Sequence, residues 1–205
     1  MHLEILSEEQ RQLIPLITSF KNEFYLACGT AIALHIGHRR SIDFDLFKQK
    51  RLNKSVLFKK LDNSNLSYFT SLSEYDQINL IINNVKLTFF QYPYAISSHK
   101  TEFIPMPNLL TLAAMKAFAL GRRSKWKDYV DLYFLIKDHY KIEEIVNQSK
   151  EIFGKQFVEK QFYAQLGYFS DINYDEEVDF LVEMPPTREE IQSFLYEASL
   201  FDLKR

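Results

Sequence analysis

The triplet Asp43-Phe44-Asp45 constrains the fold of this chain more than any other feature. With Ile42 before it and Leu46 after it, apolar and acidic side chains alternate, as in a β-strand with one buried face. We expect Ile42, Phe44 and Leu46 to face the core. The other face then carries two carboxylates about 6–7 Å apart, and a bound cation would relieve their repulsion. The triplet therefore predicts a metal-binding strand, with a solvated edge strand as the alternative.

Length and composition favour a folded, soluble protein. The 205 residues, 46% of them hydrophobic, suffice for a full core. The net charge of −2 gives no global attraction for nucleic acid, so a nucleic acid would need a local basic patch. A single cysteine, Cys28, excludes an intrachain disulfide and suits a reducing compartment. Nothing resembles a signal peptide or a bilayer-spanning run, so we expect a cytoplasmic protein without membrane contact.

The first half of the chain reads as alternating helices and strands. A capping box at Ser7 and turn-forming asparagines at Asn83-Asn84 are the clearest local signals. The patterns predict a helix at 7–20, a buried strand at 24–28, a helix at 31–37 capped by Thr30, a surface helix within 50–64, a strand at 66–72, and a hairpin of 77–82 and 85–90. Residues 91–107 should form an irregular connection.

The second half reads as helices only. We expect helices at 109–120 ending at Gly121, at 125–140 capped by Ser124, at 141–152, at 155–168, and at 187–203 opened by a second capping box at Thr187. The predicted fold class is α+β: a mixed sheet flanked by helices in residues 1–100, followed by a helical subdomain, residues 101–205, packed on this core.

Gly29 and Thr30 stand where the first strand turns into a helix. Backbone N–H groups at a helix start lack partners and, with the helix dipole, attract an anion such as a phosphate. The next strand would bring Asp43 and Asp45 close, and Mg²⁺ often takes one or two carboxylates together with phosphate oxygens. This combination suits phosphoryl or nucleotidyl transfer. The alternative for Gly29 and Thr30 is an ordinary turn and helix cap.

Three residues of the helical half are further candidates. Lys116 lies among small residues, where a lysine can contact a triphosphate or simply extend to the surface. Asp128 and Asp131 lie one helical turn apart; Asp128 also suits the helix N-terminus, and Asp131 could pair with Lys127.

Two basic clusters adjoin these motifs, and they could bind triphosphate or RNA, or be solvated turns. They comprise Arg39 and Arg40, and Arg122, Arg123, Lys125 and Lys127. His35 and His38 lack the further ligands of a zinc site and read as ordinary helix residues. Cys28 reads as a small buried residue.

Two stretches together resemble a known family. The first is Leu26–Phe47, with its glycine–threonine turn and paired aspartates; the second is Leu112–Lys116 followed by Gly121–Tyr133. With Val85–Pro93, they resemble the AbiEii/AbiGii nucleotidyltransferase-like toxin family over roughly residues 24–138. The resemblance implies a polymerase-β-like nucleotidyltransferase fold and a nucleoside triphosphate (NTP) substrate. Characterised relatives are toxins of toxin–antitoxin or phage-defence systems, and some add nucleotides to tRNA ends.

The resemblance also assigns roles to residues. Asp43 and Asp45 match the metal aspartates, for Mg²⁺ or Mn²⁺, and Gly29 and Thr30 match the phosphate turn. Catalytic candidates are Asp43, Asp45, Lys116, Asp128 and Asp131, and candidate nucleotide-binding residues are Gly29, Thr30, Arg39, Arg40 and Ser41. Cys28 stands where relatives usually have a second glycine, and its small size suggests that the change is harmless.

Thr88 is the more serious departure. The wider superfamily would place a third metal carboxylate on the strand Val85–Phe90, where this chain has Thr88. A single-metal site and a third acid from the helices both remain open. The leading hypothesis is a metal-dependent nucleotidyltransferase acting on tRNA or another RNA, as the toxin of a toxin–antitoxin or abortive-infection system with a cognate antitoxin. The alternatives are a catalytically impaired nucleotide- or RNA-binding module and a phosphotransferase that modifies a protein or small molecule.

Overall fold

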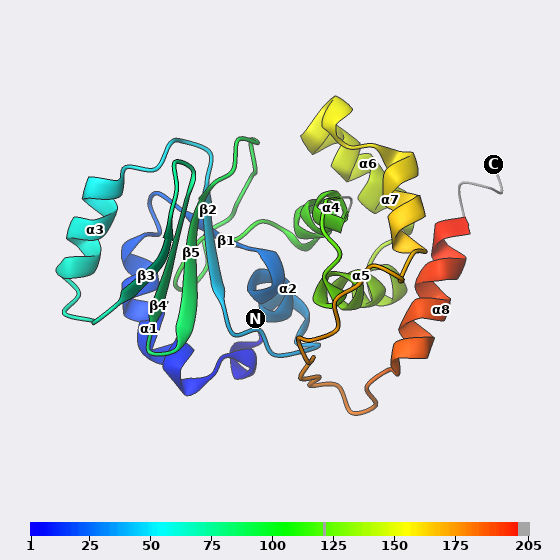
Figure 1. Ribbon diagram of the computed structural model, residues 1–205, viewed down its shortest axis with the longest axis horizontal. Helices are drawn as coiled ribbons and strands as arrows, with labels where there is room; N and C mark the ends of the chain where they lie inside the picture. The colour runs from blue at the N-terminus through cyan, green and yellow to red at the C-terminus, as the bar shows by residue number, and fades with distance from the viewer. Residues whose placement is uncertain (121, 201–205) are drawn as a thin grey trace. The chain divides into compact units, whose positions relative to one another are not determined.

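A computed structural model describes residues 1–120 and 122–200 (Figure 1). The chain forms two compact units. One contains Met1–His35 and Ser41–Asn108, and we call it the sheet unit; the other contains Ile36–Arg40 and the chain from Leu109 onward, and we call it the helical unit. The short segment Ile36–Arg40 therefore belongs to the helical unit, although it lies between two parts of the sheet unit in the sequence.

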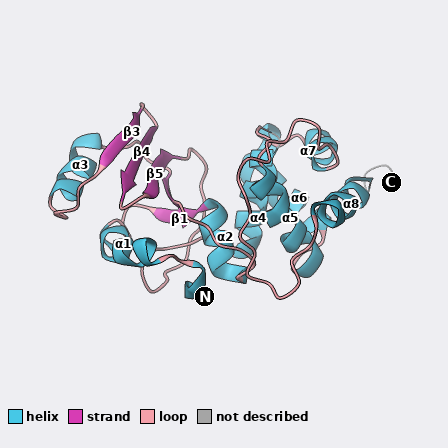
Figure 2. Cartoon of the chain, turned by 60° about the horizontal axis from the view of Figure 1, so that its bottom comes forward, coloured by secondary structure: helices cyan, strands magenta, loops and turns pink. Residues whose placement is uncertain are grey.

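The sheet unit contains all five strands of the described chain. Its elements are η1 (Leu3–Ile5), α1 (Glu8–Ser19), β1 (Tyr25–Ala27), β2 (Phe44–Lys48), α3 (Lys54–Asp62), β3 (Phe69–Ser73), β4 (Gln77–Ile82) and β5 (Val85–Gln91), and α2 (Cys28–Ile36) runs to its border. The strand order is β1-β2-β5-β4-β3, and only β2 and β5 are parallel, so the sheet is mixed (Figure 1). Figure 2 draws the strands in magenta and the helices in cyan.

One face of this sheet is the core of the unit. Phe44, Leu46 and Phe89 point to that face and are fully buried. The rings of Phe20 and Phe24, from the end of α1 and the turn after it, pack edge-on against Phe89 with centroids 4.8 and 5.2 Å away. The prediction for Ile42 was wrong: its side chain is 61% exposed, because β2 begins only at Phe44 and Ile42 precedes the paired part of the strand.

Short local signals were good predictors of turns and helix starts. Asn83 and Asn84 adopt φ values of 50° and 62°, the left-handed pair that a two-residue hairpin requires. Ser7 and Thr187 form the predicted capping boxes with Gln10 and Glu190. These signals succeed because each depends on backbone groups within three residues of the side chain.

The helical unit contains the remaining helices. They are α4 (Leu109–Leu120), α5 (Trp126–Asp138), α6 (Ile142–Phe153), the 3₁₀ turn η2 (Gly154–Gln156), α7 (Glu159–Leu166) and α8 (Arg188–Ser199). Helix α4 contacts α5, α6 and α7, and it is buried almost all round; apart from Thr111 and Lys116, its buried side chains are apolar. The mixed sheet with its flanking helices in one unit, and the helices of the other unit, confirm the predicted α+β class.

Two predicted helix caps were wrong. Helix α2 begins at Cys28 rather than Ala31, so Thr30 lies inside the first turn. Ser124 does not cap α5: Lys125 occupies the cap position, and the Ser124 hydroxyl donates to Asp171 Oδ2 at 2.7 Å. The predicted stop at Gly121 and the predicted end of the last helix at residue 203 lie outside the described residues. No helix in residues 1–120 and 122–200 has the length and hydropathy to cross a bilayer.

Candidate functional site

The predicted site residues fall into two clusters, one in each unit. The first cluster surrounds the start of β2. Asp43 lies directly before this strand and Asp45 within it, and both are partly exposed. Asp45 pairs with Ala27 of β1 on one side and with Thr88 of β5 on the other. The sheet thus holds the Asp45 backbone on both edges, which fixes the position of its carboxylate more firmly than a loop would.

Thr30 connects the start of α2 to this acidic segment. Its side chain is 1% exposed, and its hydroxyl donates to the main-chain carbonyl of Asp43 and hydrogen-bonds to Ser41 Oγ at 2.8 Å. The Gln10 amide donates to the Ser41 carbonyl at 2.8 Å. Residues Ser41 and Asp43 are therefore held against the first turn of α2. The contacts place the glycine–threonine turn beside the aspartates, and they occupy the Thr30 hydroxyl in doing so.

The backbone of Cys28 has an unusual conformation at the turn from β1 into α2. Its φ of 59° is in the left-handed region, which a side chain other than glycine rarely adopts. A glycine at this position would adopt the same conformation without strain, which gives a physical reason for the glycine of similar enzymes. The side chain is partly exposed, so the prediction of a buried cysteine was wrong.

Polar side chains extend across the sheet from Asp45. Thr88 of β5 lies opposite Asp45, and Asn79 of β4 lies opposite Thr88, so the three share one level and one face of the sheet. Thr88 is 6% exposed, and Gln77 donates to Asn79 Oδ1 at 2.8 Å. The strand position expected to carry a third carboxylate is therefore next to Asp45, where the chain presents a hydroxyl.

The donor set of this cluster fits one metal ion held jointly with a substrate. Asp43 and Asp45 supply two carboxylates, and no group of three or more His, Cys, Asp or Glu side chains within residues 1–120 and 122–200 is placed to hold a metal ion by itself. Mg²⁺ commonly binds one or two carboxylates and completes its shell with water and phosphate oxygens. The cluster therefore suits a metal that arrives with a phosphate ligand.

The second cluster is a buried ion network between α4 and α5. Lys116 Nζ lies 2.8 Å from Asp128 Oδ1 and 2.9 Å from Asp131 Oδ2. Their exposed fractions are 5%, 2% and 0%. Lys116 is thus neither a surface lysine nor a side chain that extends to solvent, because two carboxylates compensate its charge inside the unit.

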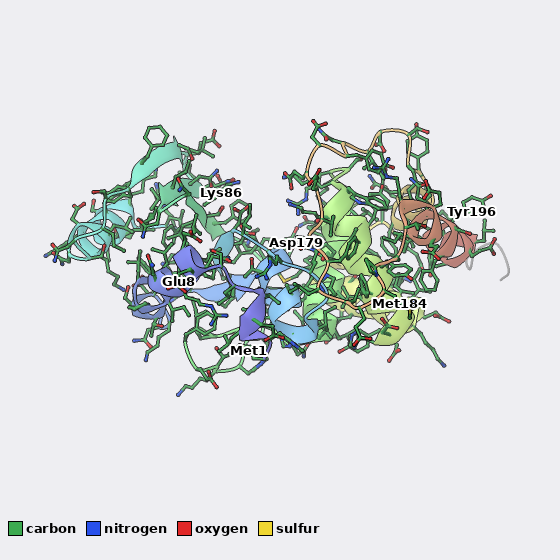
Figure 3. All side chains as sticks on the ribbon, turned by 90° about the horizontal axis from the view of Figure 1, so that it is seen from below. Met1, Glu8, Lys86, Asp179, Met184 and Tyr196 are labelled. Atoms are coloured by element: carbon green, nitrogen blue, oxygen red, sulfur yellow. The ribbon has the colours of Figure 1, made fainter. Side chains whose placement is uncertain are left out.

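The segment Ile36–Arg40 completes the network around Asp131. Arg39 donates through Nε and Nη2 to the two Asp131 oxygens at 2.8 and 2.9 Å, a bidentate pair, and His38 Nε2 lies 2.8 Å from Oδ1. Arg39 and His38 are 2% and 1% exposed. The next residue, Arg40, donates from its backbone to the carbonyl of Asp179, a residue marked in Figure 3.

Charge compensation determines the protonation of this cluster. Burial alone would raise the pKa of Asp131, but Arg39 and Lys116 hold it well below its usual range. Burial likewise opposes ionisation of Asp128, and Lys116 with Arg123, 2.8 Å away, lowers the Asp128 pKa. Burial lowers the pKa of His38 despite its bond to Asp131. Both aspartates are therefore ionised and His38 is neutral near pH 7.

Several sequence interpretations of this cluster need correction. His38 lies beyond the end of α2 and is part of the ion network, so it is not an ordinary helix residue. Lys127 pairs with Glu176 at 3.2 Å, not with Asp131. Arg39 is buried and paired, unlike the solvated turn that was its alternative. The only sequence signal for these contacts was the His-Arg pair next to the acidic strand, and nothing local connects that pair to α5.

Comparison with known proteins decides the family. Residues 83–200 match the family described as "Nucleotidyl transferase AbiEii toxin, Type IV TA system", which is more than half of the chain. The chain belongs to the AbiEii family of nucleotidyltransferase toxins. The predicted family and the predicted nucleotidyltransferase activity are confirmed. The match includes Lys116, Asp128 and Asp131, and it begins after Asp45.

Longer matches cover nearly the whole of this AbiEii family member. An uncharacterized protein of Aquifex aeolicus is 28% identical over an alignment of length 201, which covers 92% of this chain and 93% of that protein. The fold is similar to JHP933 from Helicobacter pylori, at 18% identity, a TM-score of 0.62, and coverage of 97% and 94%. It is also similar to MenT4, a nucleotidyltransferase toxin from Mycobacterium tuberculosis, at 11% identity, a TM-score of 0.65, and coverage of 95% and 82%. These structures support the predicted nucleotidyltransferase-like fold.

Proposed function

We propose that this AbiEii family member transfers a nucleotide from an NTP to an RNA acceptor, with tRNA as the first candidate, and that the reaction requires Mg²⁺ or Mn²⁺. The observation that carries the proposal is the Thr30 link. Because its hydroxyl binds both Ser41 and the Asp43 carbonyl, the first turn of α2 and the acidic strand stand together. A phosphate-binding turn beside two carboxylates is the arrangement that a metal–triphosphate complex needs.

In this proposal, Asp43 and Asp45 hold the metal ion, and the first-turn backbone N–H groups of α2 at Gly29 receive phosphate oxygens. A bound divalent ion would neutralise charge on the leaving pyrophosphate and favour ionisation of the attacking hydroxyl. Thr30 and Ser41 position these groups through their own hydrogen bonds. The Arg40 side chain is 42% exposed and pairs with Asp179 at 3.0 Å; in this proposal, it adds positive charge for the triphosphate.

We assign Lys116, Asp128 and Asp131 to the same function with positioning roles. The lowered pKa values of the two aspartates make them weak bases near pH 7, and with exposed fractions of 2% and 0% they would act by holding other residues in place rather than by contacting a reacting group. Arg39 holds Asp131 in one orientation through its bidentate contact. A residue acting in this way should affect the rate through geometry rather than through its own titration.

We further propose a toxin whose action on RNA is restrained by a cognate antitoxin, in a toxin–antitoxin or phage-defence system of the bacterial cytoplasm. Family membership supports the toxin and the antitoxin. The proposed reaction requires only that the acceptor carry a hydroxyl. RNA is the class that the resemblance to tRNA-modifying relatives favours.

The test is a transfer assay with purified protein. Each α-³²P-labelled NTP is incubated with total tRNA and Mg²⁺, with γ-³²P-labelled NTP in parallel, and with EDTA as the metal-free control. We expect α-label on RNA, no γ-label on RNA, and no product with EDTA. Label from the γ-phosphate on a protein or small molecule would instead identify a phosphotransferase. Absence of α-label on RNA with all four NTPs would contradict the proposal.

A second candidate function has one specific observation in its favour. Thr88 stands beside Asp45 where a third carboxylate was expected, so the chain could bind a nucleotide or RNA and have lost catalysis. Calorimetry separates the two functions. NTP binding with Mg²⁺ in a protein that shows no turnover would support the binding module.

A further inference from the structure

A hollow adjoins the C-terminal end of β2 within the sheet unit. Its lining includes the tyrosines Tyr25 and Tyr94 and the lysines Lys48 and Lys50, with Glu23 among the remaining residues. It encloses about 670 Å³, a size common for small-molecule and cofactor sites. None of the residue roles assigned above involves this hollow.

The two tyrosines of the hollow are connected by a chain of aromatic contacts. The Tyr25 ring lies 6.3 Å from Phe47, Phe47 lies 5.2 Å from Tyr92, and Tyr92 lies 4.9 Å from Tyr94, measured between centroids. Such tilted and edge-on contacts stabilise aromatic clusters and restrict the motion of each ring. Tyr94 is partly exposed, so the cluster presents a supported ring surface to the hollow. Nucleobases stack on surfaces of this kind.

The charge around the hollow is positive although the protein is not. Of the lining residues, Glu23 pairs with Lys48 at 3.4 Å, and Lys60, which lies outside the lining, contacts the same carboxylate at 3.1 Å. Lys50 is exposed beside them. The balance of these side chains opposes the net charge of −2 of the whole chain. Lysines next to an aromatic surface form the usual combination for single-stranded nucleic acid, because the lysines contact phosphates and the rings contact bases.

The hollow also lies close to the acidic strand. Phe47 follows Asp45 by two positions on β2, so the two side chains share one face of the sheet about 7 Å apart. We propose that the hollow binds a base and an adjoining phosphate of the single-stranded end of the RNA acceptor. This proposal rests on the proposed function. The acceptor is favoured over the NTP because the triphosphate already has the α2 turn, whereas the hollow offers side-chain cations suited to a phosphodiester strand.

The first experiment measures RNA binding without turnover. Fluorescence anisotropy of a labelled short single-stranded RNA is recorded for the full chain in the absence of NTP. We expect Tyr94→Ala to raise the Kd about tenfold and Tyr94→Phe, which keeps the ring, to leave it within about twofold. Lys50→Ala should weaken binding and reduce the slope of log K against log salt by about 0.7, the value of one phosphate on a single strand.

Matched controls come from the same unit. Tyr75 is 63% exposed and stacks with Arg51, and Lys59 is exposed on α3, and neither lines the hollow. Tyr75→Ala and Lys59→Ala should leave the Kd unchanged. A blunt RNA duplex should bind more weakly than the single strand. Equal Kd values for wild type and Tyr94→Ala, or equal loss in Tyr75→Ala, would overturn the proposal.

Steady-state kinetics separate the acceptor from the NTP and the hollow from the proposed function. Tyr94→Ala should raise KM for RNA about tenfold with KM for NTP unchanged. A raised KM for NTP with an unchanged KM for RNA would assign the hollow to the nucleotide and overturn the proposal. If wild type transfers no nucleotide to RNA but still binds single strands through Tyr94, the proposed function fails while the hollow stands as an RNA site.

Discussion

Two pairs of aspartates in this chain show how environment divides one residue type into different roles. Asp43 stands directly before strand β2 and Asp45 stands within it, and both are partly exposed. Asp45 forms no ion pair within the described residues. Asp128 and Asp131 stand on a helix, 2% and 0% exposed, and Lys116 contacts both. Asp45 therefore keeps carboxylate oxygens available for a ligand. The buried pair has its charge compensated inside the protein, so its removal should act first on stability.

The largest expected effect is on catalysis at the exposed pair. Asp45→Asn keeps the size of the side chain and removes the charge that would hold a divalent ion, so we expect nucleotide transfer to fall by about a thousandfold or more. The melting temperature should stay within a few degrees, because the side chain has no ion pair to lose within the described residues. Transfer assays and thermal unfolding of the same preparation measure both quantities. Full activity in a double variant with both Asp43→Asn and Asp45→Asn would show that these aspartates do not hold a metal ion that the reaction needs.

At the buried pair we expect the reverse order of effects. Asp131→Asn leaves the charges of Arg39 and Lys116 without their shared carboxylate, which should lower the free energy of unfolding by about 3–5 kcal/mol. Urea denaturation measures this change. Asp138→Asn, an exposed position near the end of the same helix, is the control and should change stability by less than about 0.5 kcal/mol. A loss of activity in Asp131→Asn without any loss of stability would show that the pair is not structural.

The network should also make stability depend on pH in a defined direction. The pKa values of Asp128 and Asp131 are lowered on folding, so their contribution is complete above the unfolded pKa near 4 and is lost as pH falls below it. The His38 pKa is lowered from 6.5, so the folded state resists its protonation, and stability should begin to fall as pH drops below about 6.5. Unfolding free energies measured from pH 8 to pH 3 test both limbs. In Asp131→Asn, the unfolding free energy should fall less steeply with decreasing pH below pH 4.

The smallest expected effect is at the edge of the buried network. Arg123 contacts Asp128 at 2.8 Å, but its side chain is 44% exposed, and solvent screens the pair. Arg123→Ala should therefore cost about 1 kcal/mol or less, measured by the same urea experiment. A cost as large as that of Asp131→Asn would mean that exposure does not distinguish the partners of these aspartates.

Local sequence determined the parts of this protein that depend on neighbouring residues. The capping boxes at Ser7 and Thr187, the asparagine hairpin, and the aspartates before and within β2 each follow from side chains within a few positions of one another. The same is true of the Gly29-Thr30 turn, although the helix begins earlier than expected. The φ of 59° at Cys28 was not predictable, because a cysteine carries no signal for a left-handed backbone.

Tertiary structure alone decided the ion network and the exposure of single side chains. Arg39 and Asp131 are 92 positions apart, and no periodicity in either segment indicates that they meet. Ile42 looked like a core residue by alternation and is exposed, because pairing of β2 starts after it. Lys116 looked like a surface or substrate-binding lysine and is buried between two carboxylates. Sequence patterns report the chemistry of a segment and its local geometry, whereas burial and charge pairing depend on which distant segments share a core.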